Sequence, residues 1–109
     1  MEIIIPHRKL NDVSEVLKST NSGGMTHYRV QERGMIKPEE IAIGRGTGRY
    51  TPEYIPRTKV EVILMDDQVE VLINRLIDKL GDALGGKIII LDVPTIIDLS
   101  TKKRGEDAM

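Results

Sequence analysis

The stretch KVEVILMDDQVEVLINRLIDKLGDALGGKIIILDV, residues 59–93, decides the fold class of this chain. Residues 59–65 combine β-branched side chains with partial alternation and predict a strand. Apolar residues then recur every three or four positions over residues 69–80, as they do on one face of a helix. Residues 87–93 form a near-continuous apolar run, which is typical of a strand at the centre of a sheet. The stretch therefore predicts a strand–helix–strand unit.

The two ends of the predicted helix also carry signals. Asp66 or Asp67 is expected to cap its amino end, because a carboxylate can accept hydrogen bonds from the free backbone N–H groups there. Gly85 and Gly86 are expected to close it, because glycine readily adopts the left-handed backbone conformation that often follows a helix. These signals set the limits of the helix between the two strands.

The amino-terminal part of the chain repeats this order. Residues 2–5 form a short β-branched run, and apolar residues follow at helical spacing over 10–17, with Asn11 or Asp12 as candidate caps. Residues 25–33 favour another strand, whose expected buried members are Met25, Tyr28 and Val30.

A segment without sustained periodicity, residues 34–56, separates the two units. It contains four glycines, three prolines and many charges, and therefore predicts a long exposed loop. The order β-α-β, loop, β-α-β predicts one α+β, ferredoxin-like βαββαβ domain over residues 1–109. We expect a four-stranded antiparallel sheet with both helices on one face. Residues 101–109 form a polar tail.

Composition excludes several classes of function. The formal net charge is −1 and the aromatic residues are three tyrosines, so neither a basic field nor stacking platforms favour nucleic-acid binding. The absence of cysteine excludes disulfides and thiolate metal sites. No apolar run approaches the roughly 20 residues of a membrane span, and the start of the chain does not resemble a signal peptide. We expect a soluble, cytoplasmic protein without membrane insertion.

No motif in the sequence indicates catalysis or a metal site. The run GRGTG, residues 44–48, is followed by Arg49 and then by Tyr50-Thr51-Pro52, so no helix begins where a phosphate-binding fingerprint requires one. His7 and His27 have no acidic partner at metal-ligand spacing, and a solvated or hydrogen-bonded structural role is expected for each. The GRGTG run is better explained as a flexible, cationic loop tip.

Several short motifs, in order along the chain, resemble those of the PII signalling proteins. The opening IIIPHRKLNDVSEVL is similar to the family's first strand and helix, and GMT at 24–26 matches the start of its second strand. IPRTKVE at 55–61 resembles the family's L-P-K-x-K-[IV]-E, and GKI at 86–88 matches directly. RGEDAM at 104–109 resembles the family's closing residues. The resemblance covers nearly the whole chain.

The resemblance implies a non-enzymatic signal-transduction regulator of nitrogen metabolism. It implies a homotrimer with an adenine nucleotide (ADP, AMP or ATP) in each intersubunit cleft, and a T-loop, 34–56, that contacts a target such as an ammonium transporter or another transporter. The nucleotide residues that it implies are Thr26, Gly34, Met35, Ile63, Gly86, Lys87, Lys102 and Lys103. Those implied for partner contact are Arg45, Arg49, Tyr50 and Arg57.

The sequence also departs from the family pattern. Asp98 and Ser100 stand where relatives place two phosphate-binding arginines, which argues against tight triphosphate binding unless Lys102, Lys103 or Arg104 compensates. Ile36 replaces a glutamine that helps to hold magnesium and 2-oxoglutarate, which argues against both, although Arg57 could supply a charge where the family has lysine. Tyr50 aligns with a tyrosine that some relatives uridylylate, but its neighbours Gly48-Arg49 differ from the family's Ala-Glu.

Two alternatives remain open at this level. The chain could be a PII-fold sensor that has exchanged nucleotides for another small ligand or an anion. It could also be a small ferredoxin-like enzyme or chaperone subunit that uses a subunit cleft for chemistry. Nucleotide titration separates the sensor alternatives, and turnover of a bound nucleotide would favour the enzyme.

Overall fold

The computed structural model describes residues 1–20, 22, 24–34, 41–43, 48–50, 52–81, 83 and 85–109, with the backbone alone for 41–43 and 48–50. Along the chain it contains β1 (Glu2–Ile5), the 3₁₀ helix η1 (His7–Lys9), α1 (Leu10–Ser19), β2 (Met25–Glu32), β3 (Ile41–Ile43), β4 (Gly48–Tyr50), β5 (Ile55–Val62), α2 (Asp66–Leu80), β6 (Lys87–Ile89) and the 3₁₀ helix η2 (Gly105–Ala108).

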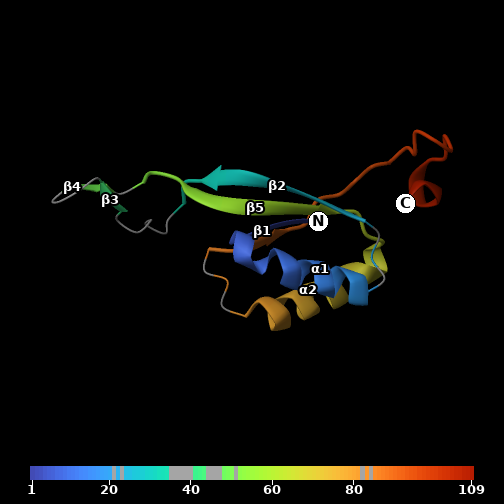
Figure 1. Ribbon diagram of the computed structural model, residues 1–109. Coiled ribbons are helices and arrows are strands. Elements are labelled where there is room, and N and C mark those ends of the chain that lie inside the picture. Colours follow the sequence, from blue (N-terminus) through green and yellow to red (C-terminus); the bar gives the residue numbers. More distant parts are fainter. Residues whose placement is uncertain are drawn as a thin grey trace.

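The four main strands form one antiparallel sheet in the order β2-β5-β1-β6. Both long helices cover the same face of this sheet, and the opposite face, here called the open face, is covered by no helix of the described residues (Figure 1). This arrangement confirms the predicted ferredoxin-like α+β fold. In the described part of the chain, no helix is both long enough and apolar enough to cross a bilayer.

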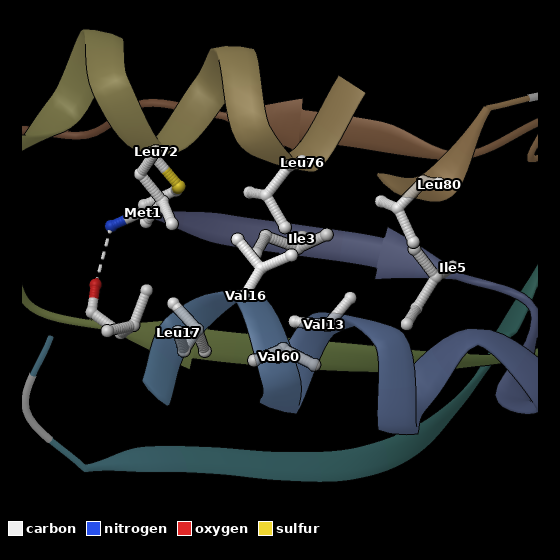
Figure 2. Packing of buried hydrophobic residues seen from close by; sticks show 11 residues of the cluster. Met1, Ile3, Ile5, Val13, Val16, Leu17, Val60, Leu72, Leu76 and Leu80 are labelled. Atoms are coloured by element: carbon white, nitrogen blue, oxygen red, sulfur yellow. Dashed lines mark hydrogen bonds between the residues drawn. The ribbon is translucent and has the colours of Figure 1, made fainter. Parts of the chain in front are cut away.

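The core lies between the helices and the sheet. Strand β1 alternates, so that Ile3 and Ile5 point to the helices and are buried, while Glu2 and Ile4 lie on the open face. Figure 2 shows the side chains of both helices directed at β1. The buried hydrophobic cluster contains Met1, Ile3, Ile5, Val13, Val16, Leu17, Val60, Val62, Leu72, Leu76 and Leu80. It has no aromatic member, in keeping with the absence of phenylalanine and tryptophan from the chain.

The last strand differs from the prediction. Residues 87–93 were expected at the centre of the sheet, but β6 lies at an edge and ends at Ile89. The central position belongs to β1, because it pairs with both β5 and β6. Beyond Ile89 the chain leaves the sheet, and Ile90, Leu91 and Val93 are exposed.

The helix ends also differ from the prediction. Helix α2 begins at Asp66, so Asp66 and Asp67 lie in its first turn, where their charge suits the helix dipole. The cap residue is Met65, whose backbone N–H donates to the Gln68 side chain (3.0 Å). The helix ends before Gly81, which has a left-handed φ of 54°, and not at the later glycine pair.

Helix α1 starts without a side-chain cap. It begins at Leu10 after the 3₁₀ turn η1, with Lys9 at the cap position. Asn11 and Asp12 therefore lie inside the first turn and do not cap it, and Asp12 forms an ion pair with Lys9 (4.0 Å). The continuous turn from η1 into α1 takes the place of the predicted cap.

The segment 34–56 contains more regular backbone than predicted. Strands β3 and β4 pair antiparallel as a two-stranded sheet, with Ile41 opposite Tyr50 and Ile43 opposite Gly48. This sheet lies beyond the end of the main sheet (Figure 1). Strand β5 also starts earlier than predicted, at Ile55.

The burial expected for β2 is only partly correct. Met25 packs against the core, but Tyr28 lies on the open face and is 41% exposed. Met25 and Tyr28 are separated by an odd number of positions, so the period of two places them on opposite faces.

Candidate functional site

The candidate site lies on the open face, where β2 and β5 lead into the loop. Arg57 is on this face, because its neighbour Thr58 points to the helices and its register partner is Val30 of β2. The arginine is only 6% exposed, and its Nε is buried with no hydrogen-bond partner among the described residues. A buried cationic N–H without an acceptor is costly, and an anion that reached it would relieve that cost.

Lys87 brings a second cation to the same face. It is the first residue of β6 and lies opposite Ile4 of β1, whose other register partner is Lys59 of β5. Its Nζ lies 3.8 Å from Oε1 of Glu32, at the end of β2. Since β2 and β6 are the two edges of the sheet, this ion pair reaches across the face that also carries Arg57.

The glycine before Lys87 is packed too tightly for a side chain. A Cβ on Gly86 would lie 2.9 Å from the carbonyl oxygen of Ala83 and 3.3 Å from that of Ile4. The Gly86 N–H also donates to the Ala83 carbonyl (2.8 Å), which closes the turn between α2 and β6. Gly86 thereby fixes the position from which Lys87 starts.

An ion pair joins the two sides of the loop base. Arg33 follows β2 and Glu53 precedes β5, and Nη1 of the arginine lies 2.9 Å from Oε1 of the glutamate. Both side chains are more than half exposed, so the pair contributes little to stability by itself. Gly34, the next residue after Arg33, is the last described residue before β3. Met35, Ile36 and Arg45 lie outside the described residues, as do the side chains of Arg49 and Tyr50.

A second group of expected nucleotide residues borders a different cavity. Thr26 and Ile63 line a cavity of about 750 Å³ together with Glu61, Gln68 and the carboxyl-terminal turn. Gly86 and Lys87 line another one, between α2 and β6. Four of the expected nucleotide residues therefore border two separate cavities of one chain.

Hydrogen bonds order the charged side chains around Glu61. Tyr28 Oη donates to Oε1 of Glu61 (2.7 Å), and this bond is the main reason why the pKa of the tyrosine is raised. Lys59 forms an ion pair with Glu2 (2.9 Å), which raises the pKa of the lysine. The open face thus carries several paired charges beside the unpartnered Nε of Arg57.

The tail contributes a turn that the sequence analysis missed. Oδ1 of Asp98 accepts hydrogen bonds from Ser100 N (2.8 Å), Ser100 Oγ (2.7 Å) and Thr101 N (3.0 Å). These bonds lower the pKa of Asp98, with the bond from the Thr101 backbone as the largest cause. An aspartate followed by serine and threonine is typical of such turns, and this signal could have revealed the role.

The lysines of the tail belong to the same turn. Lys102 has a left-handed φ of 64°, and its Nζ donates to the carbonyl oxygen of Leu99 (2.6 Å). The Lys103 carbonyl oxygen accepts from the backbone N–H of Asp98 (3.0 Å), and Ile97 pairs with Arg104. In Figure 1 this segment extends away from the helices and the sheet.

The histidines have the expected structural surroundings. Nδ1 of His7 is hydrogen-bonded to Oγ1 of the buried Thr58 (2.8 Å), and His27 is exposed. Within the described ranges, His, Asp and Glu side chains form no cluster that could hold a metal ion.

Comparison with known proteins identifies the family. The family model described as Nitrogen regulatory protein P-II matches residues 1–103. A nitrogen regulatory protein P-II of Cereibacter sphaeroides is 34% identical over a 114-residue alignment that covers 100% of this chain and 97% of the relative. Nitrogen regulatory protein P-II 1 of Escherichia coli K12 is 31% identical, with the same coverage.

A solved structure agrees with this match. The crystal structure of Arabidopsis thaliana PII bound to citrate superposes with a TM-score of 0.76 at 27% identity, over 99% of this chain and 88% of the other. The fold is that of a ferredoxin-like regulator domain. The chain belongs to the nitrogen regulatory protein P-II family, whose members are signal-transduction regulators.

Proposed function

We propose that this protein is a non-enzymatic, homotrimeric regulator that binds an adenine nucleotide and acts on a target protein through residues 34–56. The observation that carries the proposal is the pair of cations, Lys87 and the buried Arg57, on the sheet face at the root of that loop. Charge-assisted hydrogen bonds from such groups are strong ligand contacts. A ligand held there lies where β2 and β5 enter the loop, so it can favour one arrangement of the loop over another.

The separation of the expected nucleotide residues supports a site between subunits. Thr26 and Ile63 border one cavity of the chain, while Gly86 and Lys87 border another. Symmetric assembly can bring the first group of one copy to the second group of the next. The exposed apolar residues beyond β6 and the unpaired edge of that strand are surfaces that assembly would cover.

We therefore expect a stable trimer in solution. Light scattering at micromolar concentration should give about three times the 12.2 kDa mass of one chain. A mass that corresponds to one chain would contradict the proposed assembly and, with it, a cleft shared between subunits.

Lys87 is expected to be required for nucleotide binding. Its replacement by alanine removes a charge-assisted contact of about 1.5–3 kcal/mol, so ADP affinity should fall roughly tenfold or more. Calorimetric titration of ADP into the parent and into Lys87→Ala measures this change. Lys79→Ala is the matched control, because it removes another lysine with an ion pair, to Glu15 on the helical side. Equal ADP affinity in the parent and in Lys87→Ala would exclude this role for Lys87.

The same titration tests the number of phosphates. Asp98 and Ser100 supply no cation where relatives have arginines, and Asp98 retains its negative charge to low pH because its pKa is lowered. ADP and AMP are therefore expected to bind at least as tightly as ATP, with or without magnesium. An ATP affinity more than about tenfold higher would show that Lys102, Lys103 or Arg104 restores the lost charge.

A second candidate function is a sensor of small carboxylates. The Arabidopsis PII structure is described as bound to citrate, and an arginine such as Arg57 suits the planar geometry of a carboxylate. Titration with citrate and 2-oxoglutarate in the absence of nucleotide separates this candidate from the first. The proposal includes target proteins of nitrogen metabolism, among them transporters. The search for such targets requires the protein with residues 34–56 unchanged.

A further inference from the structure

The carboxylate of Glu32 lies where an anionic ligand of Lys87 would have to bind. Its Oε1 is 3.8 Å from Nζ of Lys87, and its side chain is only 21% exposed, whereas that of Lys87 is 60% exposed. The same oxygen lies 3.2 Å from the position that a Cβ on Gly34 would take, so it rests close to the backbone at the start of the loop. The glutamate is therefore held over the open face.

The surroundings of Glu32 favour an anion at this place. Lys87 provides one positive charge, and the buried Arg57 on the same face provides a second, with an Nε that has no partner in the described part of the chain. A phosphate or carboxylate from solution would be attracted to the same two groups. It would also be repelled by Glu32 at short range, where two like charges interact strongly.

We propose that Glu32 is a built-in competitor for the anionic ligand at Lys87. In the free protein the glutamate neutralises Lys87, and a ligand binds only by displacing its carboxylate. The energetic cost of this exchange rises with the negative charge of the ligand, so Glu32 also acts as a specificity determinant against highly charged anions. The inference rests on the proposed ligand site at Lys87.

The position of Glu32 in the chain links this exchange to the loop. It is the last residue of β2, and the next residue, Arg33, forms the ion pair with Glu53 across the loop base. Displacement of the Glu32 side chain therefore occurs directly beside the Arg33–Glu53 ion pair that joins the two ends of the loop. Gly34, which has no side chain, leaves room for the carboxylate beside it.

The test is Glu32→Gln, which keeps the size of the side chain and removes its charge. Calorimetry with AMP, ADP and inorganic pyrophosphate should show tighter binding than in the parent, about fivefold for ADP, with the smallest gain for AMP, which carries the least negative charge. Glu15→Gln is the matched control, because it removes a glutamate that pairs with a lysine (3.2 Å) away from the open face. It should leave all these affinities within about twofold of the parent.

A double-mutant cycle assigns the effect to Lys87. In a Lys87→Ala background, Glu32→Gln should gain less than in the parent, because the pair that it breaks is already absent. Unchanged or weaker binding by Glu32→Gln, in a variant that unfolds at the parent's temperature, would overturn the proposal. An equal gain in both backgrounds would also overturn it.

Failure of the proposed function gives a different result. If the parent binds no nucleotide, the proposed nucleotide function is excluded. Titration of the parent and of Glu32→Gln with pyrophosphate and citrate then tests the role of Glu32 independently. Tighter binding of these anions by Glu32→Gln would support the competitor without any nucleotide. Absence of anion binding in both the parent and Glu32→Gln would exclude the competitor as well.

Discussion

Leu76→Ala is expected to lower the free energy of unfolding by about 2–5 kcal/mol. Leu76 is fully buried on α2 and, in Figure 2, points to β1 among the side chains that join both helices to the sheet. Alanine removes apolar contacts and leaves a cavity that a packed core closes only in part. Urea unfolding followed by circular dichroism measures the change as a shift of the midpoint at constant slope.

The next residue provides the control for this prediction. Ile77 is on the same helix but is 58% exposed, so Ile77→Ala should change the free energy of unfolding by less than about 1 kcal/mol. If the two variants were equally stable, the assignment of Leu76 to the core would be wrong. A larger loss for Ile77→Ala would indicate that its surface is covered in the assembled protein.

Gly86→Ala is expected to have the second large effect, on stability and on binding together. The added Cβ would lie 2.9 Å from the Ala83 carbonyl oxygen, a distance at which backbone has to move, and overpacking of this kind typically costs about 1–3 kcal/mol. Because β6 starts at the next residue, the movement also displaces Lys87 from its place opposite Ile4. Thermal unfolding should occur at a lower temperature than in the parent, and titration should show a lower affinity for ADP.

Gly24→Ala is the control for this variant. A Cβ at Gly24 meets no atom within 4 Å, and Gly24 is not among the glycines with positive φ, so stability should stay close to that of the parent. Gly24 borders the cavity of Thr26 and Ile63, so this variant is a control for stability only. If Gly86→Ala were as stable as Gly24→Ala, the turn before β6 would be more adaptable than its contacts imply. If Gly86→Ala lost ADP binding but not stability, the substitution would have displaced Lys87 without weakening the fold.

The fold could be predicted from the sequence because its main elements are strongly periodic. The alternation in β1 and the helical spacing that includes Leu72 and Leu76 reflect burial on one face, and burial of that face also defines the core. The position of β6 could not be predicted in the same way. A continuous apolar run such as 87–93 looks the same in the sequence whether the strand lies at the centre of the sheet or at its edge.

The site was predictable in part, for a related reason. Lys87 and its preceding glycine were identified by a local motif, and the structure places them at a tight turn beside β1. The contact between Glu32 and Lys87 depends on strand order and on two long side chains that reach across the sheet, which no local pattern encodes. The turn around Asp98 was missed although its signal is local, because the residue was considered only as a substitute for an arginine.

The central place of β1 has a consequence for how the protein is made. The partners of Glu2–Ile5 in the sheet are residues 58–61 and 87–89, so β1 cannot pair until more than 50 further residues have been made. Until then Ile3 and Ile5 stay exposed on the nascent chain, where such apolar segments are prone to aggregate or to be held by chaperones. Helix α1 also lacks its partner α2 during this period. Pairings this distant in sequence slow folding, and the sheet can close only after residues 87–89 have been made.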